Sequence, residues 1–189
     1  MLYLYASILI ADLLAILAVI ISVVSPENRI WPPPGNGTWQ RWLFIAVDTV
    51  TSMGTPVLGL LDRGSLGMSS PTLLGVGTTL IVLGGSLVAW AVRTLSLRQS
   101  YGLRGELVTQ GPYSLSRNPQ YVGFTILYSG IILVTDSYYA LITGLAFILL
   151  VLLTPFSEEP WLEEQYGEEY IAYKERVPRF IGIPTNNRE

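Results

Sequence analysis

Two segments in the second half of the chain combine the residue types that ligand binding and group transfer require. The first follows a turn at Gly111-Pro112 and contains Arg117, Asn118 and Pro119. Asparagine at an N-cap and proline at the first helical position are typical of a helix start. The free backbone N–H groups of such a start bind anions, and Arg117 adds a permanent cation beside them. The segment is a candidate binding site, or alternatively the capped, interface-anchored start of a membrane helix.

The second segment is the acidic and aromatic stretch 157–178. Its leucine, valine and tyrosine side chains recur at helical spacing, which predicts an amphipathic helix with one buried face: Leu162, Tyr166, Tyr170, Tyr173 and Val177.

Glu159 has two interpretations within this stretch. It shares the buried face, or it caps a helix that Pro160 opens. A carboxylate on the protein side of a helix leaving a membrane needs a partner, and Arg117 or a cationic ligand is the candidate. Alternatively, Glu159 belongs to an acidic helix start that the macrodipole favours.

Composition limits the chemistry that these segments can perform. Only 13% of the residues are charged, whereas soluble domains carry about 25%, so much of the surface avoids water. The sequence contains no cysteine and no histidine, which excludes thiolate metal sites and the commonest general base. We therefore expect no metal, and the net charge of −3 gives no reason to expect a nucleic-acid partner.

Apolar runs long enough for membrane helices fill the rest of the chain. A helix needs about 20 apolar residues to cross a bilayer. The runs are 2–24, 42–61, 72–92, 121–135 and 138–156. The first is too long for a signal peptide and lacks a basic start, and the last two are interpreted as a helical hairpin. The predicted fold is an all-α integral membrane protein with about five transmembrane helices and a cytoplasmic amphipathic helix.

Small residues are concentrated in the third run, where they predict close contact with a neighbouring helix. They are Gly75, Gly77, Gly84, Gly85 and Ser86.

Basic residues predict the orientation. With five spans and the N-terminus outside, every basic residue except Arg63 lies on one side, which the positive-inside rule makes cytoplasmic. These residues are Arg29, Arg41, Arg93, Arg98, Arg104, Arg117, Lys174, Arg176, Arg179 and Arg188. The expected location is therefore a multi-pass membrane protein with a cytoplasmic C-terminal segment. A re-entrant pair formed by the last two runs would leave this sidedness unchanged.

The two chemically patterned segments also form one ordered motif across the predicted hairpin. It comprises Leu107-Val108, Gly111, Tyr113, Arg117-Asn118-Pro119, Tyr121, Gly123, Glu158-Glu159, Leu162, Tyr166-Gly167, Tyr170 and Tyr173. This motif resembles that of the isoprenylcysteine carboxyl methyltransferase family and its prokaryotic relatives. The first three runs match that family only in being hydrophobic.

The resemblance implies an S-adenosylmethionine-dependent methyltransferase without a Rossmann domain, in which a lipidic acceptor reaches the cofactor pocket from the bilayer. Residues 1–95 would then form a three-span bundle and residues 96–189 the cofactor-binding region. The implied catalytic residues are Arg117 and Glu158. The implied cofactor-binding residues are Leu107, Val108, Gly111, Tyr113, Asn118, Pro119, Tyr121 and Glu159. Either glutamate can pair with the ammonium of the cofactor, and the two tyrosines can pack on its adenosine.

Two departures from the family pattern leave the acceptor open. Asn118 stands where the family usually has histidine, so proton transfer at this position is not expected. Thr154 stands where the carboxyl methyltransferases carry arginine, which weakens the case for a prenylcysteine-like carboxylate. A phospholipid amine is the other candidate, because Gly75-Val-Gly77 and Glu158-Glu159 look similar to motifs of phospholipid N-methyltransferases. In a glycine-rich span, however, Gly-x-Gly more often serves helix packing.

Two other functions remain open at this point. Membrane sterol and steroid reductases share a related Arg-His/Asn-Pro-x-Tyr motif and use NADPH. A non-catalytic membrane scaffold protein would keep the fold without binding a cofactor.

Overall fold

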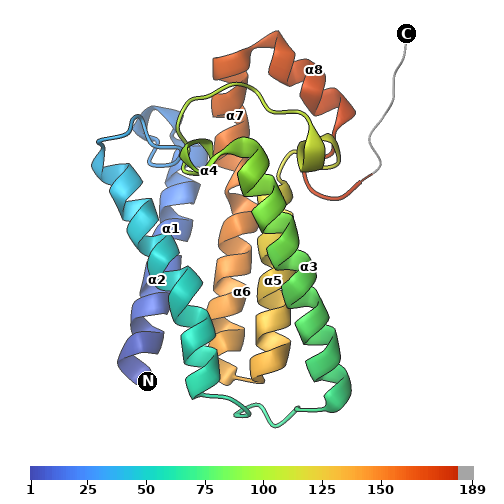
Figure 1. Cartoon of the computed structure of the whole chain (residues 1–189). Coiled ribbons are helices and arrows are strands. Elements are labelled where there is room, and N and C mark those ends of the chain that lie inside the picture. Colours follow the sequence, from blue (N-terminus) through green and yellow to red (C-terminus); the bar gives the residue numbers. More distant parts are fainter. Residues whose placement is uncertain (183–189) are drawn as a thin grey trace.

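The computed structural model describes residues 1–182, in which helices form the whole secondary structure and no strand occurs (Figure 1). The long helices are α1 (Leu2–Val24), α2 (Trp39–Leu61), α3 (Pro71–Leu95), α5 (Pro119–Thr135) and α6 (Tyr138–Leu153). The short elements are η1 (Pro26–Asn28), α4 (Leu97–Ser100), η2 (Gly111–Ser114), α7 (Pro155–Tyr166) and α8 (Glu168–Arg176). The all-α prediction is confirmed.

Four helical segments are long and apolar enough to cross a membrane: Leu2–Val24, Trp39–Leu61, Pro71–Leu95 and Tyr138–Tyr166. The fifth apolar helix, α5, has 17 residues and is shorter than a typical span. Only Asp136 and Ser137 separate α5 from α6, so the predicted hairpin is present. The chain is thus a multi-pass membrane protein. Its orientation stays a prediction, and Arg188 lies outside the described residues.

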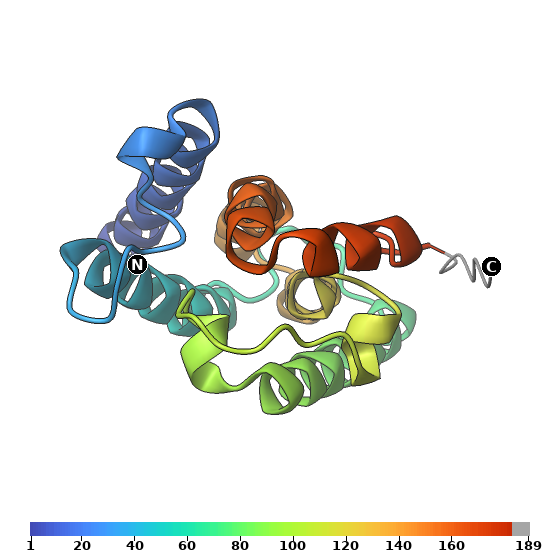
Figure 2. The same ribbon diagram turned by 90° about the horizontal axis from the view of Figure 1, so that it is seen from above.

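The helices form a bundle in which α3 lies along α5 and α1 lies along α6 (Figure 2). Gly84 of α3 faces the backbone of α5, where an added Cβ would lie 2.7 Å from the carbonyl oxygen of Gly123. Gly77 makes a similar approach to Gly130, whereas Gly75 and Gly85 have open space beside them. The small residues of α3 therefore do permit close helix packing, but only on the face that carries Gly77 and Gly84.

The core of the bundle lies between α1, α2, α5 and α6. The Tyr128 and Phe147 rings stack with centroids 4.2 Å apart, and the Tyr128 hydroxyl donates to the carbonyl oxygen of Thr51 at 3.3 Å. Because this buried hydroxyl finds a backbone acceptor, it costs little to keep in an apolar interior.

The α6–α7 junction distinguishes the two interpretations of Glu159. Thr154 has helical torsion angles, φ −54° and ψ −42°, so α7 continues almost directly from α6 and begins at Pro155. Pro160 lies inside α7 instead of opening it, so the capping interpretation is wrong. Glu159 is buried, with 2% of its surface exposed, as the alternative predicted.

The start of α5 agrees with the prediction in position but not in hydrogen bonding. Asn118 is the N-cap and Pro119 the first helical residue, yet the Asn118 side chain makes no capping bond. Its Nδ2 instead donates to the carbonyl oxygen of Arg179 at 3.0 Å. This bond ties the segment after α8 to the start of α5.

Candidate functional site

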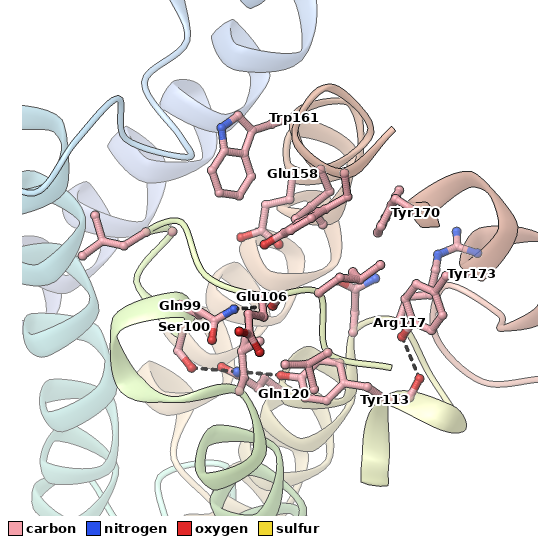
Figure 3. A pocket seen from close by; sticks show the side chains of 18 of the residues that line it. Gln99, Ser100, Glu106, Tyr113, Arg117, Gln120, Glu158, Trp161, Tyr170 and Tyr173 are labelled. Carbon is pink, nitrogen blue, oxygen red and sulfur yellow. Dashed lines mark hydrogen bonds between the residues drawn. The ribbon is translucent and has the colours of Figure 1, made fainter. Parts of the chain in front are cut away.

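At one end of the bundle, the 101–118 loop lies with α4, α5, α7 and α8 (Figure 1). A polar cleft opens between these elements (Figure 3). About 740 Å³ of space lies between its atoms, part of it open to solvent. Its wall comprises Leu95, Gln99, Ser100, Gly102, Leu103, Glu106, Leu107, Val108, Tyr113, Arg117, Asn118, Gln120, Tyr121, Glu158, Trp161, Leu162, Tyr166, Tyr170 and Tyr173. We call it the polar cleft.

Most of the residues that the sequence nominated meet in this wall. Seven of them line the cleft: Leu107, Val108, Tyr113, Arg117, Asn118, Tyr121 and Glu158. Gly111, Pro119 and Glu159 are not among the wall residues. The structure therefore brings both segments of the motif to one place, with Glu158 facing the cleft and Glu159 lying behind its wall.

Glu158 points into the cleft from α7 (Figure 3). Its Oε1 accepts two hydrogen bonds of 2.7 Å, one from Trp31 Nε1 and one from the Tyr121 hydroxyl. Its Oε2 makes no hydrogen bond to any of residues 1–182. One oxygen of this carboxylate is thus fixed by protein donors, and the other remains available to a ligand.

Glu159 forms an ion-pair network with two arginines. Arg117 Nη2 lies 2.8 Å from Glu159 Oε1, and Arg179 Nη2 lies 2.6 Å from Oε2. The hydrogen bond to Glu159 raises the pKa of Arg179 above its usual value. Of the two candidate partners named from the sequence, Arg117 or a cationic ligand, the structure shows Arg117, together with Arg179. The charge of Glu159 is therefore balanced inside the protein.

Arg117 also holds the end of α8. Its Nη1 donates to the carbonyl oxygens of Lys174 at 2.9 Å and Val177 at 2.6 Å. All three of its nitrogens therefore have protein partners, and the side chain is 8% exposed. Arg117 fixes α8 and the following segment against α5, which closes one side of the polar cleft.

A chain of neutral hydrogen bonds crosses the floor of the cleft (Figure 3). Gln120 Nε2 donates to Ser100 Oγ at 2.8 Å and to the Tyr113 hydroxyl oxygen at 2.9 Å. The Tyr173 hydroxyl donates to the carbonyl oxygen of Tyr113 at 2.6 Å. Burial raises the pKa of the Tyr113 phenol well above its usual value, so this group is neutral at physiological pH.

Several residues of the site carry no signal that identifies them in the sequence. The sequence indicates that Trp31 is an interfacial tryptophan in a proline-rich loop. In the structure this residue is 5% exposed and donates a hydrogen bond to Glu158, which lies 127 positions further along the chain. Gly102, with φ +71°, packs so closely on Pro33 that an added Cβ would lie 2.7 Å from its Cδ. The loop before α2 and the loop after α4 therefore meet beside the cleft, a long-range contact that local patterns do not encode.

A second, mostly apolar cavity adjoins the polar cleft within the bundle. Ser100, Gln120 and Tyr121 line both spaces, so they form the partition between them. The other residues of this apolar cavity are Trp31, Phe44, Val47, Asp48, Val92, Leu97, Tyr101, Phe124, Phe147, Leu150, Val151 and Thr154. The two spaces therefore adjoin inside one bundle, one with polar and charged side chains in its wall and the other mostly apolar.

Within residues 1–182, no group of three or more acidic, cysteine or histidine side chains is arranged to hold a metal ion. The binding groups of the site are therefore carboxylate, hydroxyl, amide and aromatic.

The helices and the site together define a multi-pass membrane protein with a polar cleft beside an apolar cavity. The chain belongs to the phospholipid methyltransferase family, whose model matches residues 73–169. The matched region contains Arg117, Asn118, Tyr121 and both glutamates.

One relative is protein-S-isoprenylcysteine O-methyltransferase B of Arabidopsis thaliana, which is 33% identical over 122 residues. The match covers 59% of this chain and 59% of that protein, so the chain spans about three fifths of the length of this relative. No solved structure matches.

Proposed function

We propose that this protein is an S-adenosylmethionine-dependent methyltransferase that methylates a lipid or another membrane-embedded acceptor. The observation that carries the proposal is the position of Glu158. Its carboxylate is held by Trp31 and Tyr121 where the polar cleft adjoins the apolar cavity. Membership of a methyltransferase family supports the same reaction class.

The chemistry of the cleft fits this cofactor. The ammonium of its amino-acid tail pairs with the free Oε2 of Glu158. Tyr113 and Tyr121, with Leu107 and Val108, contact the adenosine, as apolar and aromatic walls commonly do. Asn118 and the adjacent backbone bind the polar ends.

The remaining nominated residues act through their neighbours. Arg117 and Glu159 hold α8 and the segment after it over the cleft, and Gly111 and Pro119 shape the turns that lead to Tyr113 and Tyr121. In this proposal Glu158 touches the cofactor, whereas Arg117 and Glu159 are positioning residues.

The cofactor supplies an electrophilic methyl group on a positively charged sulfur. The protein contributes alignment, because methyl transfer is an in-line displacement in which correct orientation is worth several kcal/mol (about 7–11 in the best cases). The partition formed by Ser100, Gln120 and Tyr121 is where an acceptor atom from the apolar cavity meets the polar cleft. Trp161 of α7 and Tyr173 of α8 also line the polar cleft.

We also propose that the cleft faces the cytoplasm, where S-adenosylmethionine is made. The basic residues that flank this end support the assignment, since the positive-inside rule places them there. Cysteine accessibility labelling of single-cysteine variants in intact cells tests it, because the sequence contains no native cysteine. Labelling of Ser65→Cys, at the opposite end of the bundle, by an impermeant reagent is expected; labelling of Ser114→Cys instead would reverse the orientation.

Titration of S-adenosylhomocysteine and of NADPH against the detergent-solubilised full chain tests the proposed function. We expect saturable binding of S-adenosylhomocysteine and no binding of NADPH. Glu158→Gln is expected to weaken nucleoside binding at least tenfold, about 1.4 kcal/mol. Glu164→Gln is the matched control, because its side chain is 71% exposed. Binding of NADPH without S-adenosylhomocysteine would overturn the proposal.

The reductase alternative receives no support from the cleft. Among residues 1–182, Arg117 is the only basic residue that lines the cleft. Its guanidinium is already bonded to Glu159 and two carbonyl oxygens. The phosphate groups of NADPH need basic side chains that are free to bind them.

A further inference from the structure

A single carboxylate lines the otherwise mostly apolar cavity beside the polar cleft. Asp48 lies on α2 and shares this cavity with Phe44, Val47, Phe124 and Phe147. Charged side chains inside a membrane bundle are costly and usually have a functional partner. If the protein does not supply a partner for Asp48, the charge of Asp48 indicates the chemistry of the group that the cavity binds.

The protein gives Asp48 only one weak partner. The Tyr101 hydroxyl donates to Asp48 Oδ2 at 3.2 Å, and Oδ1 has no hydrogen bond within residues 1–182. Asp48 Oδ1 has some accessible surface, whereas both carboxylate oxygens of Asp12 on α1 are fully buried and have no hydrogen-bond partner among the described residues. One oxygen of Asp48 is thus free to bind a group inside the cavity.

Among residues 1–182, no basic side chain forms an ion pair with Asp48 within 4.0 Å. Arg41 lies about 10 Å earlier along the axis of the same helix. Its buried Nε has no hydrogen-bond partner among the described residues, and its charge acts on Tyr101 without forming an ion pair with Asp48. Glu159, by contrast, forms ion pairs with two arginines, Arg117 and Arg179.

The sign of this charge discriminates between acceptors. In a cavity of low dielectric, a carboxylate attracts an ammonium group strongly and repels a second carboxylate by a comparable energy. Such repulsion is an effective way to exclude a wrong ligand. An acceptor whose reacting group is a carboxylate would bring two like charges into one apolar space.

We propose that Asp48, supported by Tyr101, is the head-group site of the acceptor and selects a lipid amine over a lipid carboxylate. This inference rests on the proposed methyltransferase function and specifies its substrate class. The apolar side chains of the cavity hold the hydrocarbon part, and Asp48 Oδ1 binds the ammonium near the partition with the polar cleft.

The same pairing prepares the nitrogen for reaction. One proton passes from the ammonium to Asp48, which leaves a neutral amine with a lone pair. The lone pair forms the new C–N bond while the C–S bond breaks, and its electron pair goes to sulfur. The methylated nitrogen keeps one positive charge, the sulfonium becomes a neutral thioether, and Asp48 returns its proton to water.

The test uses the full chain in lipid nanodiscs, with methyl-labelled S-adenosylmethionine and two acceptor probes. One probe is dioleoyl phosphatidylethanolamine and the other is N-acetyl-S-farnesylcysteine. We measure label transfer to each probe, and binding of each probe to the protein loaded with S-adenosylhomocysteine by native mass spectrometry. The wild-type protein is expected to bind and methylate the amine probe in preference to the carboxylate probe.

Asp48→Asn, which keeps the size of the side chain, is expected to lower kcat/KM for the amine probe at least about tenfold. It should leave the Kd for S-adenosylhomocysteine within about twofold and should relieve the exclusion of the carboxylate probe. Glu27→Gln is the matched control, because Glu27 is an exposed carboxylate at the same end of the protein and outside both spaces.

The possible outcomes test the amine selectivity separately from the proposed methyltransferase function. Equal or stronger use of the carboxylate probe by the wild type overturns the inference, as does an Asp48→Asn variant with unchanged amine selectivity. In either case, retained binding of S-adenosylhomocysteine leaves the proposed function intact. Loss of all S-adenosylhomocysteine binding in the wild type overturns both.

Discussion

The indole Nε1 of Trp31 donates a 2.7 Å hydrogen bond to Oε1 of Glu158, which joins the loop before α2 to α7. Trp31 is held in place by Phe44, whose ring centroid lies 4.5 Å away. The Tyr121 hydroxyl donates to the same oxygen from α5. Three parts of the chain thus converge on one carboxylate oxygen, which fixes the direction in which the other oxygen points.

Trp31→Phe tests whether this orientation matters for ligand binding. Phenylalanine keeps an aromatic ring against Phe44 but cannot donate to Glu158. A hydrogen bond to a charged group contributes about 1.5 kcal/mol or more, so we expect affinity for S-adenosylhomocysteine to fall about tenfold. Isothermal titration calorimetry on the detergent-solubilised protein measures it.

Trp39→Phe is the control for this substitution. Trp39 begins α2 and is 63% exposed, so the same chemical change there removes no contact with the site. Equal affinities of the two variants would mean that Trp31 only packs.

The ion pairs of Glu159 give a prediction about stability. Glu159→Gln leaves Arg117 and Arg179 without the buried carboxylate that lies 2.8 and 2.6 Å from them. Breaking a buried pair typically costs about 3–5 kcal/mol. We expect a clear fall in Tm by thermal unfolding in detergent. Affinity for the nucleoside should fall as well, because α8 loses its attachment to α5.

Glu164→Gln provides the comparison, since Glu164 is 71% exposed and lies 3.8 Å from Arg29. Such surface pairs contribute about 0–1 kcal/mol, so its Tm should stay near that of the wild type. A Glu159→Gln protein of normal stability that had lost nucleoside affinity would place Glu159 in direct contact with the ligand instead.

The features predictable from the sequence are those that depend on local composition. Apolar runs predicted the observed bounds of α1, Leu2–Val24, and the α5–α6 hairpin that Asp136 and Ser137 interrupt. Charge complementarity predicted a cationic partner for Glu159 and named Arg117 as one of two candidates, beside a cationic ligand. In each case the physical requirement, burial of apolar surface or neutralisation of a buried charge, is visible in the residues themselves.

The features that were missed depend on how helices rotate and which loops meet. Nothing in the sequence distinguishes Gly84, which touches the α5 backbone, from its neighbour Gly85, which faces open space. Trp31 meets Glu158, and Tyr101 meets Asp48, only after the whole bundle has formed. These contacts come from tertiary packing, which no single segment specifies.

The two adjacent glycines of α3 make a matched pair of variants. An added methyl group at Gly84 would lie 2.7 Å from the Gly123 carbonyl oxygen, which cannot move without shifting α5. Overpacking of this kind costs about 1–3 kcal/mol. Gly84→Ala should therefore lower the Tm, whereas Gly85→Ala should leave it unchanged or raise it slightly, because alanine favours helix. Equal responses would contradict the observed α3–α5 interface.

Asp136, at the opposite end of the bundle from the cleft, gives a prediction for pH. The Ser69 hydroxyl donates to Asp136 Oδ2 at 2.7 Å, and the backbone N–H groups of Met68 and Ser69 donate to the same carboxylate. The Ser69 hydroxyl and these backbone donors hold the pKa of Asp136 below its usual value of 3.8. The ionised carboxylate therefore stabilises the link between the 62–70 loop and the α5–α6 turn.

Because the pKa of Asp136 is lower in the folded state, its contribution is complete above about pH 4 and is lost as the pH falls through the folded-state value. Asp136→Asn keeps the left-handed backbone, φ 50°, which asparagine tolerates, but it replaces an acceptor oxygen with an NH₂ donor. We expect this variant to have a lower Tm than the wild type at pH 7. The difference should shrink as both are acidified below pH 4, since the wild type then loses its ionised carboxylate. Asp62 accepts hydrogen bonds from the Ser137 and Ser65 hydroxyls at the same end of the bundle, and these bonds lower its pKa as well. Because Asp62 titrates in both proteins, the difference between them isolates Asp136. A gap in Tm that stays constant or widens on acidification would show that Asp136 does not stabilise the fold through its charge.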